Sequence, residues 1–515
     1  MTVNAEREVK LNAPRKFELP DLHELGLGTV RLPVQSLSTS YFDTEDLRLW
    51  QRKITLRHRI GEDEGTGLWT LKLPGKETRN ELDRTELSWP GIPGEPPSEA
   101  TLLLRGIVRR QTLKRVAVLE TKRRRVLVRN GGSALGEIDD DLVTVAVGPV
   151  PGRAFRQIEF ELDESEHPQA DPAVIEKMLT AMKKAGAQID LEQKFARALG
   201  IDANDRNPST TKVDAKSTLG QLVQTTLRSE FERLLDFDVS LRLRPQNPPE
   251  RAIHQARVAT RRMRSDLKTF GPVLDPVWLR HTRSELRWIG TVLGAVRDID
   301  VMDKRFQSDN SASRDARGGD TLHSRLAAQR RNKTEELAYV LQSERYLNLL
   351  DRLDAGTSLP RFYVSPQATE AGNREVGPAD LARSVLPGLL GPHWRNLRRR
   401  VRKAGATPSD TQLHKIRIAA KQLRYGAELA EPVLGKATRR TARRAEEIQT
   451  ILGDHHDSVT AVEWLEQIPA DSTTWDSFVA GGKAADARRH LLESRRQWEH
   501  AWDRLNRRTV VGWLE

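Results

Sequence analysis

The sequence predicts an α+β protein of two domains: an antiparallel β barrel with peripheral helices, followed by an all-α duplicated helical bundle. Three observations predict this class: short alternating apolar and charged runs up to about residue 165, helical periodicity from about residue 218, and a repeat within the helical part. A polar stretch at 201–217 reads as a linker. We therefore expect one domain at 1–200 and a second at 218–515.

The composition is that of a globular protein with a heavily charged surface. Hydrophobic residues make up 37% and charged residues 30% of the chain, and the absence of cysteine excludes disulfides and thiolate metal sites. No apolar run approaches the roughly 20 residues that would span a bilayer. Glu6 and Glu8 lie where a secretory signal would be basic and then apolar. We expect a cytoplasmic protein with no membrane partner.

Positive charge is concentrated in the second domain. Residues 1–200 hold 31 Lys and Arg against 31 Asp and Glu, whereas residues 201–515 hold the remaining 53 against 41. The whole excess of 12 positive charges therefore lies after residue 200. A basic domain of this kind indicates a polyanionic partner such as polyphosphate, nucleic acid or a membrane surface.

The first domain is predicted as short strands separated by turns rich in Gly, Pro and Asp, such as "GEDEGTG" at 61–67 and "PGIPGEPP" at 90–97. Helical patterns interrupt the strands around 99–110 and 171–185. The clearest strand segments are "ITLRHRI" (54–60), "WTLKLP" (69–74), "RTELSW" (84–89), "RRRVLVRN" (123–130) and "RQIEFELDE" (156–164).

One face of these strands carries the charge. Alternate side chains share a face, so "EREVKL" places Glu6, Glu8 and Lys10 opposite Val9 and Leu11. Like charges two residues apart are only about 7 Å from each other and repel. The acids are Glu137, Asp139, Asp141, Glu159, Glu161 and Asp163, and the bases are Arg57, Arg59, Lys72, Arg84, Arg123 and Arg125.

Two interpretations of that face are open. It is either an ordinary solvated face, or it points into the barrel and holds counter-ions. Segregation by sign, strand by strand, favours the second: divalent cations on the acidic strands and phosphates on the basic ones.

The second domain contains an internal repeat, expected at about 218–353 and 379–515. "IHQARVATRRMRSDL" (253–267) is similar to "LHKIRIAAKQLRYGA" (413–427), at an offset of 160 positions from His254 to His414. "VLGAVRDID" (292–300) is similar to "ILGDHHDSV" (451–459), at an offset of 159. Two matches at nearly one offset indicate duplication.

Each repeat carries a cationic stripe on one helix face. Helical spacing aligns these residues on one side of each helix, and a repeated stripe predicts a shared groove for a linear polyanion. A solvated basic face is the alternative. We also expect the histidines to be protonated near phosphates, so that binding tightens as pH falls through about 6.5. The stripes are His254, Arg257, Arg261, Arg264 and Lys268 in the first repeat, and His414, Arg417, Lys421 and Arg424 in the second.

The first 200 residues resemble the CYTH domain of the triphosphate tunnel metalloenzymes. The resemblance rests on Glu6-x-Glu8-x-Lys10, on "SYFDTEDLRL" (40–49), "WTLKLPG" (69–75) and "LEQKFARAL" (191–199), and on the order of acidic and basic strands. It implies a closed tunnel of antiparallel strands that hydrolyses or cyclises triphosphates with Mg²⁺ or Mn²⁺.

The resemblance also implies roles for individual residues. Glu6, Glu8 and Lys10 would be catalytic. The implied metal ligands are Glu6, Glu8, Glu137, Asp139, Glu159 and Glu161. The implied phosphate-binding residues are Lys10, Arg57, Arg59, Lys72, Arg84, Arg123, Arg125 and Lys194, and in "KRRRV" Arg124 could replace either neighbour.

Residues 218–515 resemble the CHAD domain, a duplicated helical bundle, through the repeated H-x-x-R-x-x-x-[RK] motif. This resemblance implies binding of inorganic polyphosphate. Together the two predict a metal-dependent triphosphatase acting on inorganic triphosphate, with an attached polyphosphate-binding domain and possible association with polyphosphate granules. The alternatives are an adenylate cyclase, a nucleoside or thiamine triphosphatase, or a non-catalytic adaptor on such granules. Nucleic acid is an unlikely partner, because the basic domain has few aromatic residues for stacking.

Overall fold

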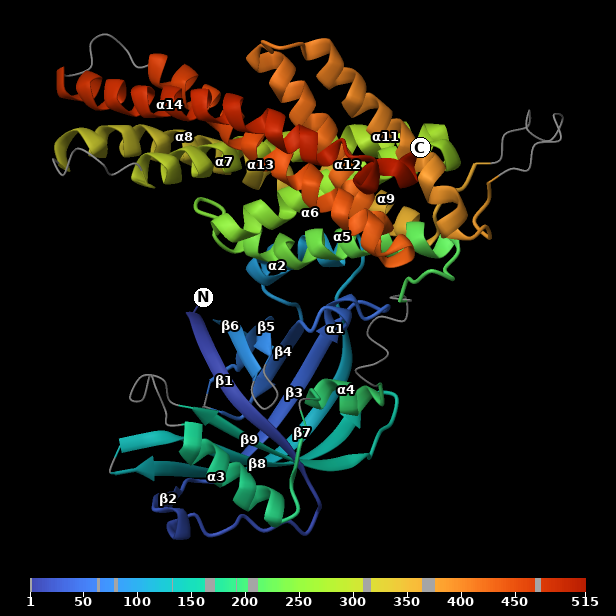
Figure 1. The fold of residues 1–515 in the computed structure, drawn as a ribbon. Coiled ribbons are helices and arrows are strands. Elements are labelled where there is room, and N and C mark those ends of the chain that lie inside the picture. The colour runs from blue at the N-terminus through green and yellow to red at the C-terminus, as the bar shows by residue number, and fades with distance from the viewer. Residues whose placement is uncertain are drawn as a thin grey trace. The chain divides into compact units, whose positions relative to one another are not determined.

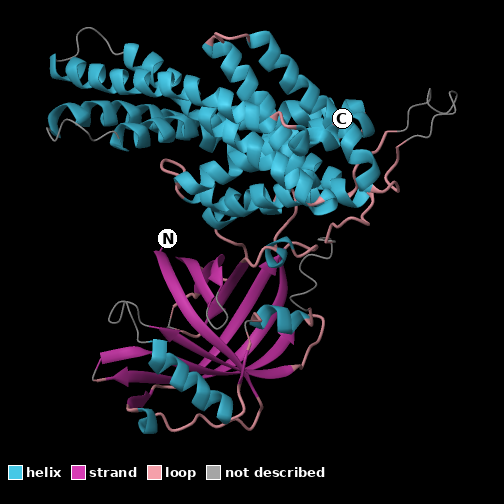
Figure 2. Cartoon of the chain, in the orientation of Figure 1, coloured by secondary structure: helices cyan, strands magenta, loops and turns pink. Residues whose placement is uncertain are grey.

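The chain forms two compact units, Met1–Pro208 and Ser209–Glu515, in a computed structural model (Figures 1 and 2). An antiparallel β unit precedes a helical unit, which confirms the predicted fold class. Most of the predicted linker at 201–217 lies outside the described residues. The structure describes residues 2–62, 65–77, 82–131, 133–162, 172–190, 192–201, 212–308, 316–363, 376–467 and 474–515, without the side chains of 3–7, 76–77, 82–84, 172, 308, 316–321, 474–476 and 478.

The β unit is a sheet closed on itself. Its strands run in the order β10-β1-β6-β5-β4-β3-β7-β8-β9, and β1 also pairs with β9, which removes the free edges of the main sheet. β2 pairs with β7 outside this path. The strands are β1 (Thr2–Ala13), β2 (Leu27–Arg31), β3 (Gln35–Asp43), β4 (Thr55–Ile60), β5 (Leu68–Glu77), β6 (Leu82–Pro90), β7 (Lys114–Asn130), β8 (Ser133–Val147), β9 (Ala154–Leu162) and β10 (Gln188–Ile189).

Strand alternation separates an apolar outer face from a charged inner face. Outward-facing Leu11, Ile158 and Phe160 pack with Met178 and Met182 of α3. Burying these apolar side chains fixes the strand register, because a slip of one residue would turn the charged row toward α3. The helical elements of this unit are η1 (His23–Leu25), α1 (Arg48–Gln51), α2 (Ser98–Val108), α3 (Pro172–Lys184) and α4 (Lys194–Leu199).

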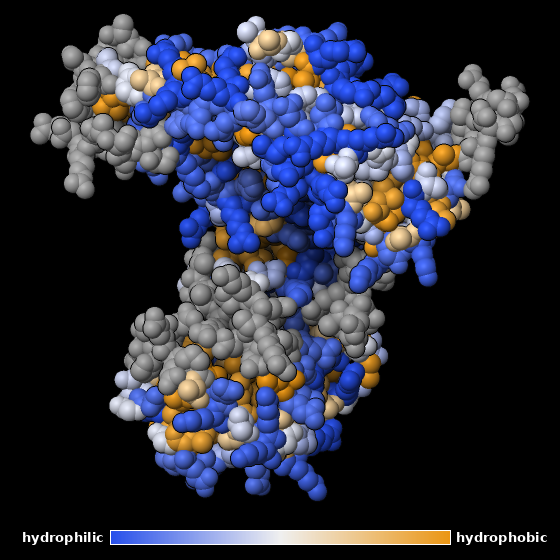
Figure 3. All heavy atoms as spheres, in the orientation of Figure 1, coloured by the Kyte–Doolittle hydropathy of each residue, from blue (hydrophilic) through white to orange (hydrophobic). Residues whose placement is uncertain are grey.

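The helical unit has one large apolar core to which both repeats contribute, including Met263, Ile289, Leu423 and Ile448. Figure 3 shows hydrophilic residues over most of the visible face of these helices. None of the described helices combines the length and apolar character needed to cross a bilayer. The helices are α5 (Leu219–Leu243), α6 (Glu250–Thr269), η3 (Gly271–Val273), α7 (Pro276–Ser308), α8 (Ala316–Gln342), α9 (Glu344–Ser358), α11 (Ala382–Ala404), α12 (Asp410–Leu434), α13 (Lys436–Glu466), α14 (Thr474–Leu505), α15 (Arg508–Val511) and η4 (Gly512–Leu514).

A helix glycine faces an arginine at matching positions of the two repeats. In the first, a Cβ on Gly294 of α7 would lie 2.0 Å from Nη1 of Arg257 on α6. In the second, a Cβ on Gly453 of α13 would lie 3.6 Å from Nε of Arg417 on α12, an ordinary contact distance. The missing side chain is therefore needed to make room for the arginine in the first repeat, whereas the second repeat has space for a Cβ.

A buried ion pair ties α5 to the helices beside it. The Arg242 guanidinium donates to Asp238 (Nε to Oδ2, 2.6 Å) and to the Leu341 carbonyl (2.8 Å), while the Tyr346 hydroxyl donates to Asp238 (3.0 Å). Both charged side chains are almost fully buried, at 2% and 0% exposed. Each charge is therefore stable only with the other present.

Removing one partner of this pair should destabilise the helical unit strongly. Asp238→Ala leaves the Arg242 charge uncompensated, and the free energy of unfolding should fall by about 3–5 kcal/mol. Asp354→Ala removes one of the two acidic partners of the partly exposed Arg228, which keeps Glu232, and should cost about 1 kcal/mol or less. Urea unfolding followed by circular dichroism compares them; equal losses would contradict the central role of the buried pair.

Candidate functional site

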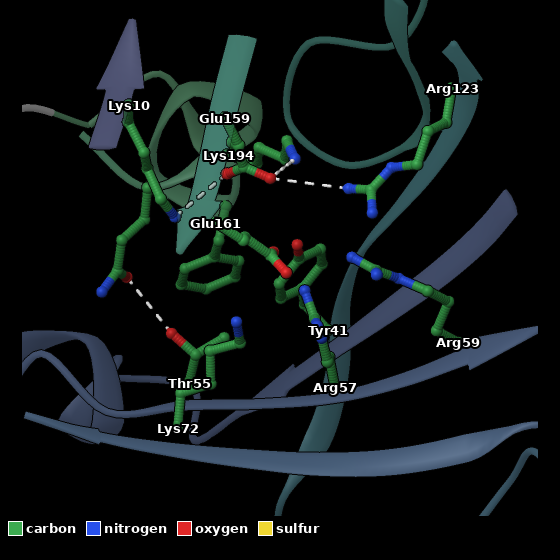
Figure 4. A pocket seen from close by; sticks show the side chains of 12 residues that line it. Lys10, Tyr41, Thr55, Arg57, Arg59, Lys72, Arg123, Glu159, Glu161 and Lys194 are labelled. Carbon is green, nitrogen blue, oxygen red and sulfur yellow. Dashed lines mark hydrogen bonds and ion pairs between the residues drawn. The ribbon is translucent and has the colours of Figure 1, made fainter. Parts of the chain in front are cut away.

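The β barrel encloses a cavity with charged walls (Figure 4). β1, β4, β5 and β7 contribute basic side chains, β9 contributes acidic ones, and the segment entering α4 contributes one further lysine. The lining residues are Lys10, Tyr41, Thr55, Arg57, Arg59, Lys72, Arg123, Glu159, Glu161, Gln193, Lys194 and Phe195.

Glu159 is the meeting point of three cations. Its Oε1 lies 3.1 Å from Nζ of Lys10, and its Oε2 lies 2.5 Å from Nζ of Lys194 and 3.5 Å from Nη2 of Arg123. Burial opposes ionisation of this carboxyl, but the three cations outweigh it and hold the pKa of Glu159 well below its usual range. Glu159 is therefore a carboxylate at neutral pH.

Arg123 holds the acidic wall from the other side. Its Nε and Nη2 each donate to Asp141 at 2.8 Å, a bidentate arrangement, and its Nη1 contacts Asp139. Burial raises the pKa of Asp139 to about 8 despite Arg123, because Asp141 and Glu161 are also close. Negative charge is thus crowded on this wall, which a bound cation would relieve.

Three carboxylates on this wall come close enough to share a metal ion. One oxygen each from Glu8, Glu159 and Glu161 lie within 4.8 Å of one another. Oxygen ligands bind Mg²⁺ at about 2.0–2.1 Å, so two ligands of one ion are at most about 4.2 Å apart, close to the separation found here. In the described part of the chain no other three His, Asp or Glu side chains approach each other so closely.

The structure places the predicted tunnel residues in three groups. Arg125 and Glu137 form a bidentate pair with each other and do not line the cavity. Glu6 and Arg84 are opposite each other in the β1–β6 register, but their side chains lie outside the described part of the structure. Those in or beside the cavity are Glu8, Lys10, Arg57, Arg59, Lys72, Arg123, Asp139, Glu159, Glu161 and Lys194.

The structure shows which arginine of "KRRRV" is buried in the barrel. Arg123 is buried in the barrel, whereas the Arg124 side chain is 64% exposed and contacts Asp140 at 3.8 Å. Strand parity aligned Asp141 with Glu137 and Asp139 but gave it no role; in the structure it binds both Arg123 and Lys194. Gln193, next to Lys194, had no sequence signal; it accepts from the Thr55 hydroxyl at 3.3 Å.

The helical unit has a second cavity, which we call the basic cleft. It lies among α6, α7, α12 and α13 and combines side chains from both repeats. It is lined by Arg257, Arg261, Arg264, Asp298, Val301, Met302, Arg305, His414, Arg417, Lys421, His456, Asp457 and Thr460.

Most of the two predicted stripes meet in this cleft, but three residues do not. His254 and Lys268 are exposed on α6 and are not part of its lining. Arg424 instead forms ion pairs with Glu428 (2.6 Å) and Glu446 (3.1 Å).

Comparisons with known proteins agree with this geometry. Family models of the CYTH domain and the CHAD domain match residues 4–197 and 225–466 respectively. Uncharacterized proteins of two Mycobacterium tuberculosis strains are 32% identical to the chain over 521 residues, which cover 93% of this chain and 94% of theirs. The chain belongs to the CYTH–CHAD family. Both resemblances seen in the sequence are thereby confirmed.

Two solved structures are similar to parts of the chain. The CHAD domain of Ricinus communis is 22% identical, with a TM-score of 0.44, over 57% of this chain and 93% of that one. A putative adenylyl cyclase of Hippeastrum, described as having a dominant triphosphatase activity, is 19% identical with a TM-score of 0.24, over 37% and 93%. CYTH enzymes are metal-dependent triphosphatases or cyclases, and CHAD domains are linked to polyphosphate.

Lys421 is a cation of the basic cleft whose pKa is strongly shifted. Burial, together with Arg261, Arg417 and Arg257, lowers the pKa of its amine to about 6, while Asp457 opposes the shift. Burial and the neighbouring His456 ring, 4.2 Å away between centroids, lower the pKa of His414 to about 4. Burial therefore favours the neutral form of His414 in the protein without ligand, and its protonation by contact with phosphate stays a prediction.

The amine of Lys421 should titrate near neutral pH. Its reactivity toward an acylating reagent should rise with a midpoint at about pH 6, measured by mass spectrometry of the labelled peptide. Arg261→Gln removes a cation that disfavours the charged amine, so the midpoint should rise. Arg439→Gln, which removes an exposed charge paired with Glu431, is the matched control. An unchanged midpoint in Arg261→Gln would contradict the electrostatic explanation.

Proposed function

We propose that this chain is a divalent-metal-dependent triphosphatase acting on inorganic triphosphate, whose CHAD domain binds inorganic polyphosphate. One observation carries the first part: six cations line the cavity together with two members of a three-carboxylate cluster. The carboxylates are Glu8, Glu159 and Glu161, and the cations are Lys10, Arg57, Arg59, Lys72, Arg123 and Lys194.

The cations suit a short chain of phosphates. Triphosphate carries four to five negative charges, and arginine forks bind phosphate oxygens bidentately. Arg57, Arg59 and Lys72 come from adjacent strands β4 and β5 and line the cavity together. Phosphates would thus be held along one wall while the carboxylates lie on another.

The carboxylate cluster fits a Mg²⁺ or Mn²⁺ ion. Glu8, Glu159 and Glu161 would hold it, and the ion would supply charge neutralisation and an activated water. Lys10 also contacts Glu8, at 3.0 Å. Lys10 and Lys194, which neutralise these acids in the structure, would become available to phosphate oxygens once a divalent cation takes over that role. A purely binding module would not need this cluster.

Hydrolysis should depend on the metal and on the cluster. We expect release of phosphate from triphosphate with Mg²⁺ or Mn²⁺ and its loss in excess EDTA. Glu161→Gln keeps the shape but removes a charge, and the rate should fall about 10²–10³-fold. Glu120→Gln, on the outside of β7 and bonded to Ser38, should retain wild-type kinetics. Full activity in EDTA would exclude the metal mechanism.

The basic cleft supports the second part of the proposal. Arg257, Arg261, Arg417 and Lys421 converge from two repeats, and the buried Arg417 Nε has no hydrogen-bond partner within the described residues. Burial, Arg261 and Arg257 lower the pKa of both Arg417 and Lys421, and a bound anion would relieve this repulsion. A polyanion with charge on every unit and no base to be read matches a cleft with this lining.

Removing the shared cations should abolish polyphosphate binding. Alanine at Arg257, Arg261, Arg417 and Lys421 together should weaken the Kd for long-chain polyphosphate about 10²-fold or more at low salt, because fewer phosphates are neutralised and fewer counter-ions are released. Triphosphate hydrolysis should remain. The charge-matched control replaces four surface arginines, namely Arg439, Arg443, Arg488 and Arg489. The polyphosphate affinities of the two quadruple variants are compared by titration in EDTA. Equal affinities would mean that the stripes are a solvated face.

The affinity should also depend on pH through Lys421. A bound anion raises the amine pKa from about 6 in the free protein, so the complex takes up a proton near neutral pH. Affinity should therefore rise as pH falls toward about 6 and level off below it. Lys421→Arg stays charged and should bind without this pH dependence, whereas an unchanged pH profile in that variant would assign the effect to another group.

A further inference from the structure

The two repeats differ at the C-terminal end of the cationic stripe. In the second repeat Arg424 is neutralised by Glu428 and Glu446. The matching positions of the first repeat, at offsets of 160 and 159, hold Arg264, Lys268 and Arg287. Cations therefore stand in the first repeat where the second has two acids.

Another cavity, which we call the extension, adjoins the basic cleft on the side of the first repeat. Both cavities are lined by Arg257, Arg261, Arg264 and Asp298, so they are contiguous. The extension runs between α6 and α7 and adds Thr260, Leu286, Gly290, Thr291 and Gly294. Gly290 leaves space at a position where the second repeat holds Gln449, whereas Gly294 is matched by another glycine, Gly453.

Further cations follow this extension outward along α7. Arg283 and Arg287 precede Gly290 and Gly294 at helical spacing, on the same face of the helix. Burial, Arg287 and Arg283 all lower the pKa of Arg264, and burial, Arg283 and Arg400 lower that of Lys268. In the described part of the chain, the buried Nε atoms of Arg283 and Arg400 have no hydrogen-bond partner.

We propose that Arg264, Arg283 and Arg287 form a second phosphate-binding track, along which a polyphosphate chain leaves the basic cleft toward Lys268. The proposal rests on polyphosphate binding in the cleft and adds a direction to it. Mutually repelling cations beside an open cavity favour a bound polyanion. The second repeat offers no equivalent path among its described residues, because its acids neutralise Arg424.

Lysine footprinting tests the track in the full-length protein. Acetylation is measured by mass spectrometry in EDTA, with and without polyphosphate of about 100 units, at low salt where phosphate contacts are strongest. Lys421 reports on the cleft, Lys268 on the track, and exposed Lys436 at the start of α13 is the control. Bound chains should reduce acetylation of Lys421 and Lys268 about threefold or more and leave Lys436 unchanged.

A charge swap localises the effect. Arg287→Glu copies the acid found at the matching position of the second repeat, and because Arg287 is exposed the fold should be retained. Protection of Lys268 should be lost while that of Lys421 persists. Arg439→Glu makes the same charge change on α13 and should leave both protected.

The outcomes separate the two proposals. Protection of only one of the two lysines in the wild-type protein, or full protection of Lys268 in Arg287→Glu, would overturn the track. Protection of neither lysine would overturn polyphosphate binding in the cleft itself.

Discussion

The contact of Glu159 with Lys10, Lys194 and Arg123 is the interaction on which the barrel interior depends. The three cations come from β1, α4 and β7, and the carboxylate from β9, so one buried group joins four separated elements. An isolated buried charge would be prohibitively costly, and mutual pairing is what permits so many ionised groups inside one barrel. The same pairing keeps the cations positioned beside the acids.

Strand periodicity predicted which residues of β1 and β4 face the barrel interior. Glu8, Lys10, Arg57 and Arg59 all occupy the inner face because alternate residues of a strand share a side. Periodicity could not predict which charged side chains form ion pairs with each other. Arg125 binds Glu137 of the next strand rather than lining the cavity, and this depends on side-chain contacts across the β7–β8 hairpin.

The helical half shows the same limit for a different reason. Spacing along α6 and α12 placed Arg257, Arg261 and Arg417 on the correct faces. It could not show that Glu446, on α13, neutralises Arg424, since that contact joins two helices. Nor could it show that Lys421 loses its charge near pH 6, because crowding by arginines from both repeats exists only in the folded protein.

Closure of the barrel by β1 and β9 has a consequence for synthesis of the chain. Glu8 pairs with Glu161, and Lys10 with Glu159, across about 150 residues of intervening sequence. A nascent chain can form the hairpins between them as they emerge, but β1 must wait unpaired on that side until β9 leaves the ribosome. The acidic cluster therefore forms only after β9 has been made, and shorter nascent chains lack it.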